Sequence, residues 1–381
     1  MKVLFVTRGF PSDDDPMSGN YEAVQAKAIA SKGVQVGVVT VRMKSVRHLF
    51  KRNKTTHRMV NGISVYERIG ICFSTRFWQF LSLNDRLRCY AFQRLFRQYI
   101  DENGLPDIIH AHILFCGYSA LSLKQKYNRP LVITEHWSKA FSSNISNRLR
   151  KMSSTYSRAD CVICVSQVLA DSLKRNFQVD SIVINNMVSD LFFNKKKNKR
   201  SDGTFRFIAC GAFRKDRNKG FDILVDAFAL GQFPPNIYLD IIGDGPDRSI
   251  IESKIVQHGL DGQVRLLGVK TPEEVSDILC NSDCFVLSSR LETFSIVIIE
   301  AMAKGLPVIA TRCGGPETFL LPEHGLLIEK ENMEQLILAM KYMIDHYQDY
   351  NSDDIRQFCF DHFSQDVIAN QIIKIYTQLL S

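Results

Sequence analysis

Short apolar runs alternate with helix-length segments along the whole chain. The runs predicted as strands in the first half are 2–7, 35–41, 107–112, 131–135, 161–165 and 181–184. Those in the second half are 205–210, 237–242, 264–267, 284–287, 307–310 and 325–328. Helices are predicted between them, for example at 21–32, 84–103, 166–176, 220–230, 247–258, 272–280 and 294–304, and throughout the chain after 331. Such alternation predicts an α/β protein with parallel sheets.

The 381 residues exceed what one hydrophobic core usually supports, so two domains are expected. The apolar periodicity stops in the charged stretch 194–203. We therefore predict a first domain at 1–187, a solvated linker at 188–203 and a second domain from 204 onward. Both domains have the pattern of a doubly wound sheet, which binds ligands at the carboxyl ends of its strands. The lysine run in the linker lacks interleaved aromatic residues, which argues against nucleic acid as its partner.

Composition favours a cytoplasmic protein. No run approaches the roughly 18 apolar residues of a membrane-spanning helix, and residues 1–7 form a predicted strand, not a signal peptide. The ten cysteines are scattered without a disulfide framework, as is typical of a reducing compartment. Cys161 and Cys164 have metal-like spacing, but on a strand they point to opposite faces and cannot share an ion.

The net charge of +8 is unevenly distributed. Residues 1–187 hold 27 Lys and Arg against 13 Asp and Glu, whereas residues 188–381 hold 21 against 27. The stretch 42–99 is basic and rich in aromatic residues, a combination that favours an anionic membrane surface. Much of 84–99 must also pack as an ordinary amphipathic helix. Nucleic acid is the rival partner, but the chain has no recognition motif for it. We expect peripheral membrane binding through 42–99.

The most informative motif lies in residues 282–320. A predicted strand ends near Glu292, a helix that contains Glu300 follows, and Gly305 ends that helix. Glu292 precedes the helix N-terminus, where backbone N–H groups favour anions. Glu300 lies about two turns further on, so the two carboxylates, roughly 10 Å apart, could bind hydroxyl groups at opposite ends of an extended ligand. Spacing alone equally permits one N-terminal acid and one solvated glutamate.

The segment from Glu292 to Glu300 resembles the E-x7-E signature of family 4 glycosyltransferases, a large group of retaining enzymes with the GT-B fold. The similarity continues through 301–310 and Gly314-Gly315, and upstream through 241–246, 264–268 and 282–289. It covers about residues 205–330 in continuous order. The resemblance implies two Rossmann-like, doubly wound domains that face each other across a cleft. The second domain would be 204–363, and a last helix at 364–381 would return to the first domain.

The resemblance also assigns roles to the matching residues. Glu300 would accept hydrogen bonds from the ribose hydroxyls of a nucleotide, and Glu292 would face the donor sugar as a catalytic residue. The backbone of Thr293, Phe294 and Ser295 would contact the sugar and its phosphate. The usual form of this loop is Glu-Gly-Phe-Gly, so Thr293 and Ser295 add side chains where glycine allows the closest approach.

Lys219 lies in the segment 210–220, which resembles the family's loop before a Lys-Gly helix start. It would neutralise the diphosphate leaving group. Ala212 stands where the family often has an arginine, and either Arg214 or Arg217 would replace that arginine in donor binding.

In the first half, the resemblance rests on two strand ends and one loop. His112 ends a strand and matches a histidine of the catalytic region, whereas His110 is interpreted as a core histidine. His136 matches a second cleft position, on the acceptor side. Gly19 resembles the glycine loop that approaches the donor phosphate. Residues 13–15, three aspartates, match a DxD metal motif in form but are interpreted as a solvated loop, because the resemblance implies a metal-independent enzyme.

The resemblance predicts a retaining glycosyltransferase of the hexosyltransferase type that uses a nucleotide-diphosphate sugar and no cofactor. The expected acceptor is a lipid-linked glycan in the synthesis of cell-surface polysaccharide or glycolipid, at the inner face of the cell membrane. Two alternatives stay open from the sequence. One is an epimerase or phosphorylase of the same fold, the latter with covalently held pyridoxal phosphate. The other is an inactive partner protein that binds a nucleotide sugar, as Ala212 and the altered loop after Glu292 suggest.

Overall fold

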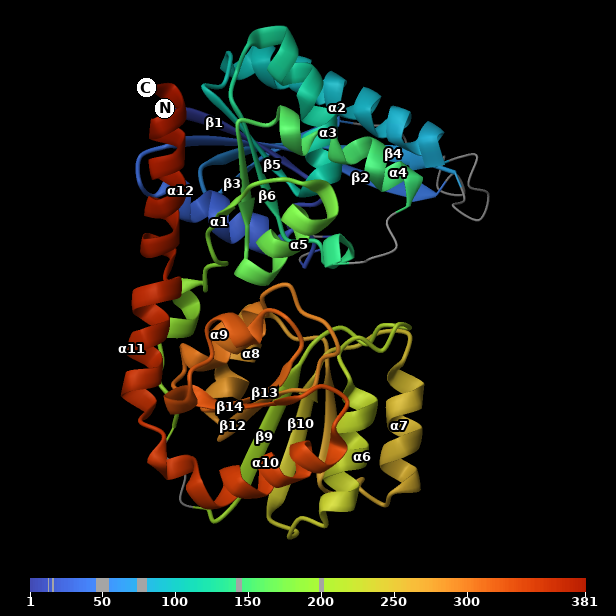
Figure 1. Ribbon diagram of the computed structural model, residues 1–381, viewed down its shortest axis with the longest axis vertical. Helices are drawn as coiled ribbons and strands as arrows, with labels where there is room; N and C mark the ends of the chain where they lie inside the picture. The colour runs from blue at the N-terminus through green and yellow to red at the C-terminus, as the bar shows by residue number, and fades with distance from the viewer. Residues whose placement is uncertain (13, 16, 46–54, 74–80, 142–145, 199–201) are drawn as a thin grey trace. The chain divides into compact units, whose positions relative to one another are not determined.

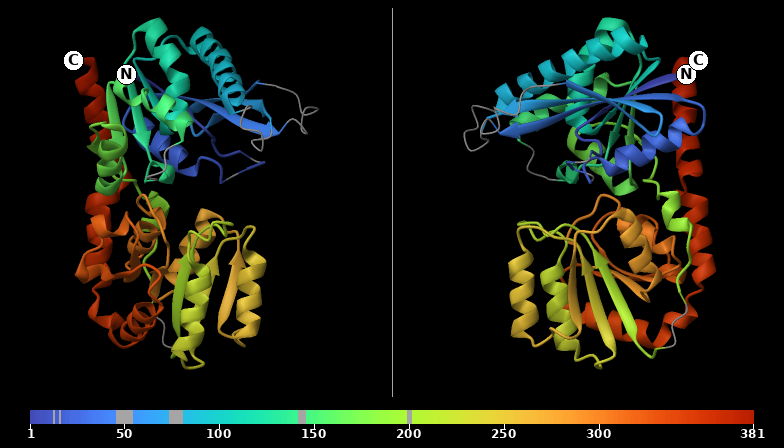
Figure 2. Two further views of the ribbon diagram at one scale, coloured as in Figure 1. Left: turned by 45° about the vertical axis from the view of Figure 1, so that its right-hand side comes forward. Right: turned by 180° about the vertical axis from the view of Figure 1, so that it is seen from behind.

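The computed structural model describes residues 1–12, 14–15, 17–45, 55–73, 81–141, 146–198 and 202–381. The chain divides into two compact units, which are described separately: unit 1 is Met1–Asn185 with Ile368–Ser381, and unit 2 is Asn186–Val367. Each unit is a sheet covered by helices, as Figures 1 and 2 show. The predicted α/β class with parallel sheets is confirmed. Within these ranges, no helix combines the length and apolar character needed to cross a membrane.

In the described part of unit 1, eight strands form one sheet in the order β3-β4-β2-β1-β5-β6-β7-β8. Their bounds are β1 Lys2–Thr7, β2 Gln35–Ser45, β3 Thr55–Val60, β4 Ile63–Cys72, β5 Ile108–His112, β6 Leu131–Glu135, β7 Cys161–Cys164 and β8 Ile182–Val183. The α-helices are α1 Asn20–Ala30, α2 Leu81–Asn103, α3 Ile113–Tyr127, α4 Asn147–Ser153, α5 Gln167–Phe177 and most of α12 Gln365–Leu380. Helix α1 covers one face of the sheet, and α2 and α3 cover the other (Figure 1). The central strands are apolar because both of their faces are covered.

The apolar pattern did not predict the hairpin of β3 and β4. These strands pair antiparallel, and Asn61 and Gly62 form the two-residue turn between Val60 and Ile63. Both turn residues have positive φ, 49° and 78°, which is the conformation that Asn-Gly favours in hairpins. Strand β3 is the edge of the sheet and most of its side chains are exposed or half-buried, so it lacks the apolar run that marks the other strands.

In the part of unit 2 that the structure describes, six parallel strands have the order β11-β10-β9-β12-β13-β14. Their bounds are β9 Phe205–Cys210, β10 Ile237–Ile242, β11 Val264–Gly268, β12 Cys284–Leu287, β13 Val308–Arg312 and β14 Gly325–Glu329. The α-helices are α6 Phe221–Gly231, α7 Arg248–Gln257, α8 Pro272–Cys280, α9 Ile296–Met302, α10 Met333–His346 and α11 Ser352–Phe363. Helices α6 and α7 cover one face of the sheet, and α8 and α9 cover the other (Figure 1). Buried apolar residues such as Phe207, Leu239 and Phe228 form the core of this unit.

Two groups of contacts bear on the predicted domain boundaries. The hydroxyl group of Tyr376, in α12, contacts Nδ1 of buried His110, and Nε2 of His110 lies 2.7 Å from Oγ1 of Thr134. These contacts attach the last helix to the sheet of unit 1.

Within the predicted linker, Lys195 forms an ion pair of 2.7 Å with Asp277, which is in unit 2. The chain enters unit 2 at Asn186, and the first lysines of the run are bound to that unit.

Candidate active site

Each sheet has one point at which its strand order reverses. In unit 2 the reversal lies between β9 and β12, and in unit 1 it lies between β1 and β5. Open α/β sheets bind ligands at the carboxyl ends of the strands beside such a point. The loop after β9 carries Lys219 and the loop after β12 carries Glu292. In unit 1, His112 ends β5 at the corresponding edge.

Lys219 and Glu292 form an ion pair at the edge of the unit 2 sheet. Nζ of Lys219 lies 2.7 Å from Oε1 of Glu292, and the hydroxyl group of Ser289 donates to the same oxygen at 2.7 Å. The two charged side chains are mostly buried, with exposed fractions of 21% and 12%. Burial acts to lower the pKa of Lys219, but the charge and hydrogen bond of Glu292 outweigh it, so that the pKa is raised. Lys219 is therefore a fixed cation at this edge.

A glycine lets the loop after β9 approach the loop after β12. Gly220, which precedes α6, has a φ of 65°, and a Cβ at this position would lie 2.0 Å from the carbonyl oxygen of Ser288. That conformation and that contact exclude a side chain. On the other side, the N–H of Glu292 donates to the carbonyl oxygen of Cys313 at 2.9 Å, and its own carbonyl oxygen accepts from Gly315 at 2.9 Å. The main chain of Glu292 is thus held by these two bonds, and its carboxylate is held by Lys219 and Ser289.

Glu300 lies in α9, half-buried, and its carboxyl group has no hydrogen-bond partner among the residues that the structure describes. Burial raises the pKa of Glu300 to about 8. The charge of Glu300 also reaches Cys210 at the end of β9, where burial first and Glu300 second raise the pKa of the thiol to about 12. A half-buried carboxyl group without a partner is able to accept hydrogen bonds from a ligand's hydroxyl groups.

The loop between Glu292 and α9 keeps a glycine-like backbone without a glycine. Ser295 has φ 84° and ψ 81°, in the left-handed region that favours glycine. Its hydroxyl group is buried and has no hydrogen-bond partner in the described part of the chain. Phe294 is fully buried against Phe319 and Phe363 and anchors the loop in the core. Thr293 is half-buried. Ser295 therefore holds a backbone conformation that glycine would take without steric cost.

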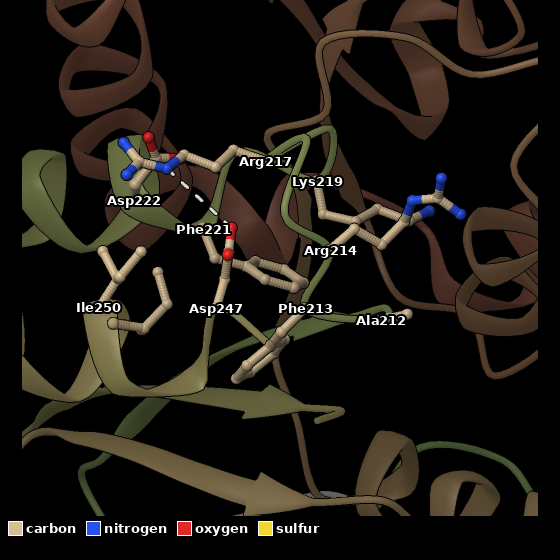
Figure 3. A pocket seen from close by; sticks show the side chains of 11 residues that line it. Ala212, Phe213, Arg214, Arg217, Lys219, Phe221, Asp222, Asp247 and Ile250 are labelled. Atoms are coloured by element: carbon tan, nitrogen blue, oxygen red, sulfur yellow. Dashed lines mark ion pairs between the residues drawn. The ribbon is translucent and has the colours of Figure 1, made fainter. Parts of the chain in front are cut away.

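The two candidate arginines of the loop after β9 are both exposed and both paired. Arg214 lies 3.0 Å from Asp216, and Arg217 lies 4.0 Å from Asp247. The side chains of Arg214 and Arg217 point in different directions (Figure 3). Together with Lys219 they line a small hollow of about 10 Å³. A bound phosphate would compete with an aspartate for either arginine.

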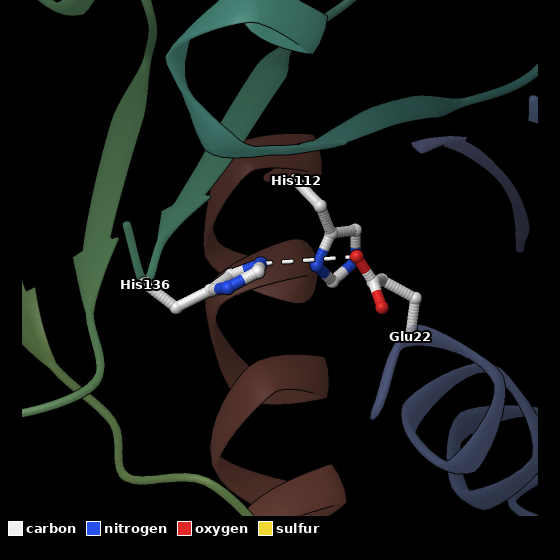
Figure 4. Close-up of side chains that lie close together, drawn as sticks. All are labelled: Glu22, His112 and His136. Carbon is white, nitrogen blue, oxygen red and sulfur yellow. Dashed lines mark ion pairs between the residues drawn. The ribbon is translucent and has the colours of Figure 1, made fainter. Parts of the chain in front are cut away.

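In unit 1, three side chains from different elements meet at the carboxyl edge of the sheet. His112 comes from β5, His136 follows β6, and Glu22 comes from α1 (Figure 4). Their ligand atoms all lie within 4.8 Å of one another, and Nε2 of His136 is 3.9 Å from Oε1 of Glu22. His112 is fully buried, and neither of its ring nitrogens has a hydrogen-bond partner among the described residues. Both histidines were predicted at this edge from the sequence, whereas Glu22 was not.

Burial biases this histidine cluster (Glu22, His112 and His136) toward uncharged forms. Burial, with the neighbouring histidines, holds the pKa of His112 well below its usual value. Burial and the charge of Arg8 lower the pKa of His136 to about 4, and burial raises the pKa of Glu22. Neutral imidazoles can both donate and accept hydrogen bonds, so they can bind hydroxyl groups. Two imidazoles and a carboxylate are also ligands that zinc accepts.

Two further residues shape this edge of unit 1. Gly19 precedes α1 with a φ of 67°, and a Cβ there would lie 2.2 Å from the carbonyl oxygen of Gly9, so the glycine lets two loops touch. Glu135 is buried and accepts hydrogen bonds from the N–H groups of His136 and Trp137 at 3.0 and 2.9 Å. It therefore fixes the turn that carries His136. Glu135 ends an apolar strand directly before His136, and that position could have identified it from the sequence as a residue of this edge.

The basic and aromatic stretch 42–99 is divided between the core and the surface. Residues 46–54 and 74–80 lie outside the described residues, as does Asp13 of the aspartate triplet. Helix α2 buries aromatic side chains on its inner face, namely Phe92, Phe96 and Tyr99. It exposes basic and aromatic side chains on its outer face, namely Arg86, Tyr90, Arg94 and Arg97. The described part of the stretch thus consists of the end of β2, the β3–β4 hairpin and the amphipathic helix α2, whose outer face carries these basic side chains.

Two parallel-sheet α/β units of this topology are characteristic of GT-B glycosyltransferases, and solved structures agree with that class. HepE from Anabaena in complex with UDP matches with a TM-score of 0.74 at 19% identity, over 99% of this chain and 100% of that one. Its complex with UDP-glucose matches with a TM-score of 0.73 at 18% identity over the same shares. A likeness at this level of identity shows the fold.

Sequence comparison identifies the family. The model described as Glycosyltransferase Family 4 matches residues 21–190, and the model described as Glycosyl transferases group 1 matches residues 192–357. An uncharacterised glycosyltransferase from Methanocaldococcus jannaschii is 33% identical over 293 residues, which are 74% of this chain and 77% of the relative. The gpi3 subunit of phosphatidylinositol N-acetylglucosaminyltransferase from Schizosaccharomyces pombe is 24% identical over 349 residues, 88% of this chain and 73% of the relative. The chain belongs to glycosyltransferase family 4, and it is a glycosyltransferase.

Proposed function

We propose that the enzyme transfers a sugar from a nucleotide-diphosphate sugar to a hydroxyl group of a lipid-linked glycan acceptor, with retention of the anomeric configuration. The product would belong to a cell-surface polysaccharide or glycolipid. Unit 2 binds the donor and unit 1 binds the acceptor. The observation that carries the proposal is the placement of Lys219, Glu292 and Glu300 around the strand-order reversal of unit 2.

Each of these three residues suits one part of the donor. Glu300 offers an unpartnered carboxyl group to the ribose hydroxyls. Lys219 supplies the positive charge that the departing diphosphate requires, and no metal or other cofactor takes part. Glu292 holds the lysine in place and is available to the hydroxyl groups of the sugar. The complexes of HepE with UDP and UDP-glucose support a nucleotide sugar as the donor of this chain.

The acceptor would bind to unit 1 at a membrane surface. The relative from Schizosaccharomyces pombe is named for transfer to phosphatidylinositol, which supports a lipid-linked acceptor for this chain. The exposed face of α2 carries Arg86, Arg94 and Arg97, and each basic residue near an anionic membrane contributes about 1 kcal/mol of binding. We place the enzyme at the cytoplasmic face of such a membrane. His112 and His136 would bind hydroxyl groups of the reacting sugars.

Calorimetry with UDP, GDP and ADP tests the donor class. One of the three should bind at least tenfold more tightly than the others, and Glu300→Ala should weaken that binding at least tenfold. Glu323→Ala is the matched control, because Glu323 is an exposed glutamate of the same unit. The donor class would be wrong if none of the nucleotides bound.

A transfer assay with the matching nucleotide sugar tests the reaction itself. Release of nucleotide diphosphate together with a glycosylated product is expected from the wild type, and NMR of the product reports the anomeric configuration. Glu292→Ala should abolish transfer while the protein stays folded. Full transfer by that variant would refute the role of Glu292. Donor binding without transfer to any glycan acceptor would instead support the alternative that the chain is an inactive partner protein that binds a nucleotide sugar.

A further inference from the structure

Arginine side chains gather around a hollow at the carboxyl edge of the unit 1 sheet. The hollow has a volume of about 240 Å³, and its lining includes Arg8, Arg88, Phe115, Trp137 and Arg148. These residues come from the loop after β1, from α2, from α3, from the loop after β6 and from α4. We call it the arginine hollow. None of its residues was among the predicted site residues.

Two of the arginines are held against one aromatic ring. The guanidinium carbons of Arg88 and Arg148 lie 5.4 and 4.9 Å from the centre of the Phe115 ring. Phe115 packs in turn on Trp137, with the ring centres 4.9 Å apart. Stacking on an aromatic face fixes a guanidinium group while its N–H groups stay available at its edge. The rings therefore hold two of the hollow's three guanidinium groups in place.

The hollow has more positive charge than its acidic neighbours neutralise. Arg88 and Arg148 share a single carboxylate, Asp85, at 3.5 Å from Arg88 and 2.7 Å from Nε of Arg148. Arg8 has no ion pair or hydrogen bond with any residue that the structure describes. Glu22, whose charge reaches Arg8, does not line the hollow. Three guanidinium groups thus line the hollow, and the neighbouring Asp85 is the one carboxylate paired with any of them, which leaves a surplus of two positive charges.

A neighbouring hollow shares part of this lining but is more evenly charged. It contains Arg8 and Arg88 again, with Arg42 and Lys44 opposed by Asp14 and Asp15, and Arg42 is further paired with Glu67. Its four cations are opposed by three carboxylates, so the larger surplus lies on the side that Arg148 and the aromatic rings enclose. A doubly negative oxyanion matches that surplus, and the planar fork of arginine matches phosphate in geometry.

We propose that the arginine hollow binds a phosphate group of the acceptor. The inference rests on the proposed function, since it takes unit 1 as the acceptor-binding unit. Arg8 and Trp137 both line the hollow, and Trp137 directly follows His136 in the chain, so the hollow lies beside the histidine cluster. A phosphate bound at Arg8, Arg88 and Arg148 anchors the acceptor next to His136 and leaves the rest of the acceptor free to present a hydroxyl group.

Fluorescence of Trp137 gives a local test. The chain has two tryptophans, so a Trp78→Phe background leaves Trp137 as the one tryptophan, which is excited selectively at a wavelength that tyrosine does not absorb. Inorganic phosphate is titrated into this full-length protein at constant ionic strength. We expect a saturable change in emission, a dissociation constant at least tenfold higher in Arg8→Ala, and an intermediate value in Arg8→Lys, which keeps the charge but loses the fork. Arg175→Ala, an exposed arginine of the same unit, should leave the constant unchanged.

Two controls establish that the response is specific for phosphate and local to the hollow. Acetate at the same concentrations should give no saturable change, and Lys219→Ala should not alter the Trp137 response, because it removes a cation from unit 2. Equal phosphate affinity of the background protein and Arg8→Ala, or a response that does not saturate, would overturn the proposal. Arg8 has no partner in the described residues, so its replacement should leave the melting temperature within about 2 °C, which calorimetry verifies.

The source of the phosphate is distinguished with two probes. Glycerol 3-phosphate represents a soluble phosphate ester, and phosphatidylcholine vesicles with phosphatidic acid represent a lipid headgroup. A saturable, Arg8-dependent response to either probe supports the subsite, and a response to neither overturns it. Phosphate binding without sugar transfer would refute the proposed function but not the phosphate site. Sugar transfer without phosphate binding would refute the phosphate site alone.

Discussion

Nζ of Lys219 lies 2.7 Å from Oε1 of Glu292, and the two residues belong to the loops on either side of the strand-order reversal of unit 2. Removing one member of such a mostly buried pair leaves the other charge without a partner and still desolvated. The pair therefore links the stability of the donor-side loops to the chemistry that we propose for them. A ligand phosphate would offer Lys219 a second anion without requiring the lysine to move far.

The first prediction is a double-mutant cycle on this pair. Lys219→Met and Glu292→Gln should each lower the free energy of unfolding by about 1–3 kcal/mol, because each leaves a half-buried partner uncompensated. The double variant should lose less than the sum, with a coupling energy of about 1 kcal/mol or more. Urea unfolding of the four proteins measures this. Lys219→Met should also lower kcat for transfer at least a hundredfold. Additive unfolding effects would show that the ion pair contributes no stability.

The second prediction concerns the left-handed backbone of Ser295. Ser295→Gly should raise the free energy of unfolding by about 1 kcal/mol, because glycine takes this conformation without steric cost. Ser295→Ala is the matched control: it removes the buried hydroxyl group but keeps Cβ. If the alanine variant were stabilised as much as the glycine variant, the unpartnered hydroxyl group, and not the backbone, would be the source of the cost. Thermal and urea unfolding of the three proteins decide between these causes.

The third prediction is the pH dependence that Glu300 imparts. Its pKa is raised to about 8 in the folded protein, above its value in the unfolded chain, so the folded state binds the proton more tightly. This contribution is fully present below about pH 4.5 and is lost as the pH rises through 8. Between pH 6 and 8.5, the free energy of unfolding of the wild type should therefore fall more steeply than that of Glu300→Gln. The difference in slope should be at most about 1.4 kcal/mol per pH unit. Parallel curves for the two proteins would contradict it.

Strand ends could be predicted from the sequence because parallel strands are apolar on both faces. The runs that end at His112, at Glu135 and before Ser288 stand out as continuous hydrophobic segments. The β3–β4 hairpin was missed because an edge strand has no such run. Its signal was local: Asn61-Gly62 between Val60 and Ile63 is a strong turn sequence. The hairpin is therefore predictable from its turn and not from its strands.

Contacts between distant segments could not be predicted from the sequence alone. The unit 2 motif was predictable because Glu292 and Glu300 lie in one continuous segment. Glu22 meets His112 and His136 only because α1 crosses the edge of the sheet where β5 and β6 end. The arginine hollow likewise joins α2 and α4 with the loop after β1. No local spacing encodes such a meeting, since it depends on strand order.

The fourth prediction separates the histidine cluster from a metal requirement. If Lys219 supplies the charge for the leaving group, dialysis against EDTA should leave the rate of transfer within twofold of its starting value. Added Zn²⁺ should inhibit instead, because His112, His136 and Glu22 offer it two imidazoles and a carboxylate within 4.8 Å, and bound zinc would occupy groups that we assign to hydroxyl binding. His136→Asn should raise the inhibitory zinc concentration at least tenfold, whereas replacing the exposed His346 by Asn should not. Loss of transfer in EDTA, restored by Zn²⁺ and abolished in His136→Asn, would show that the cluster is a catalytic metal site.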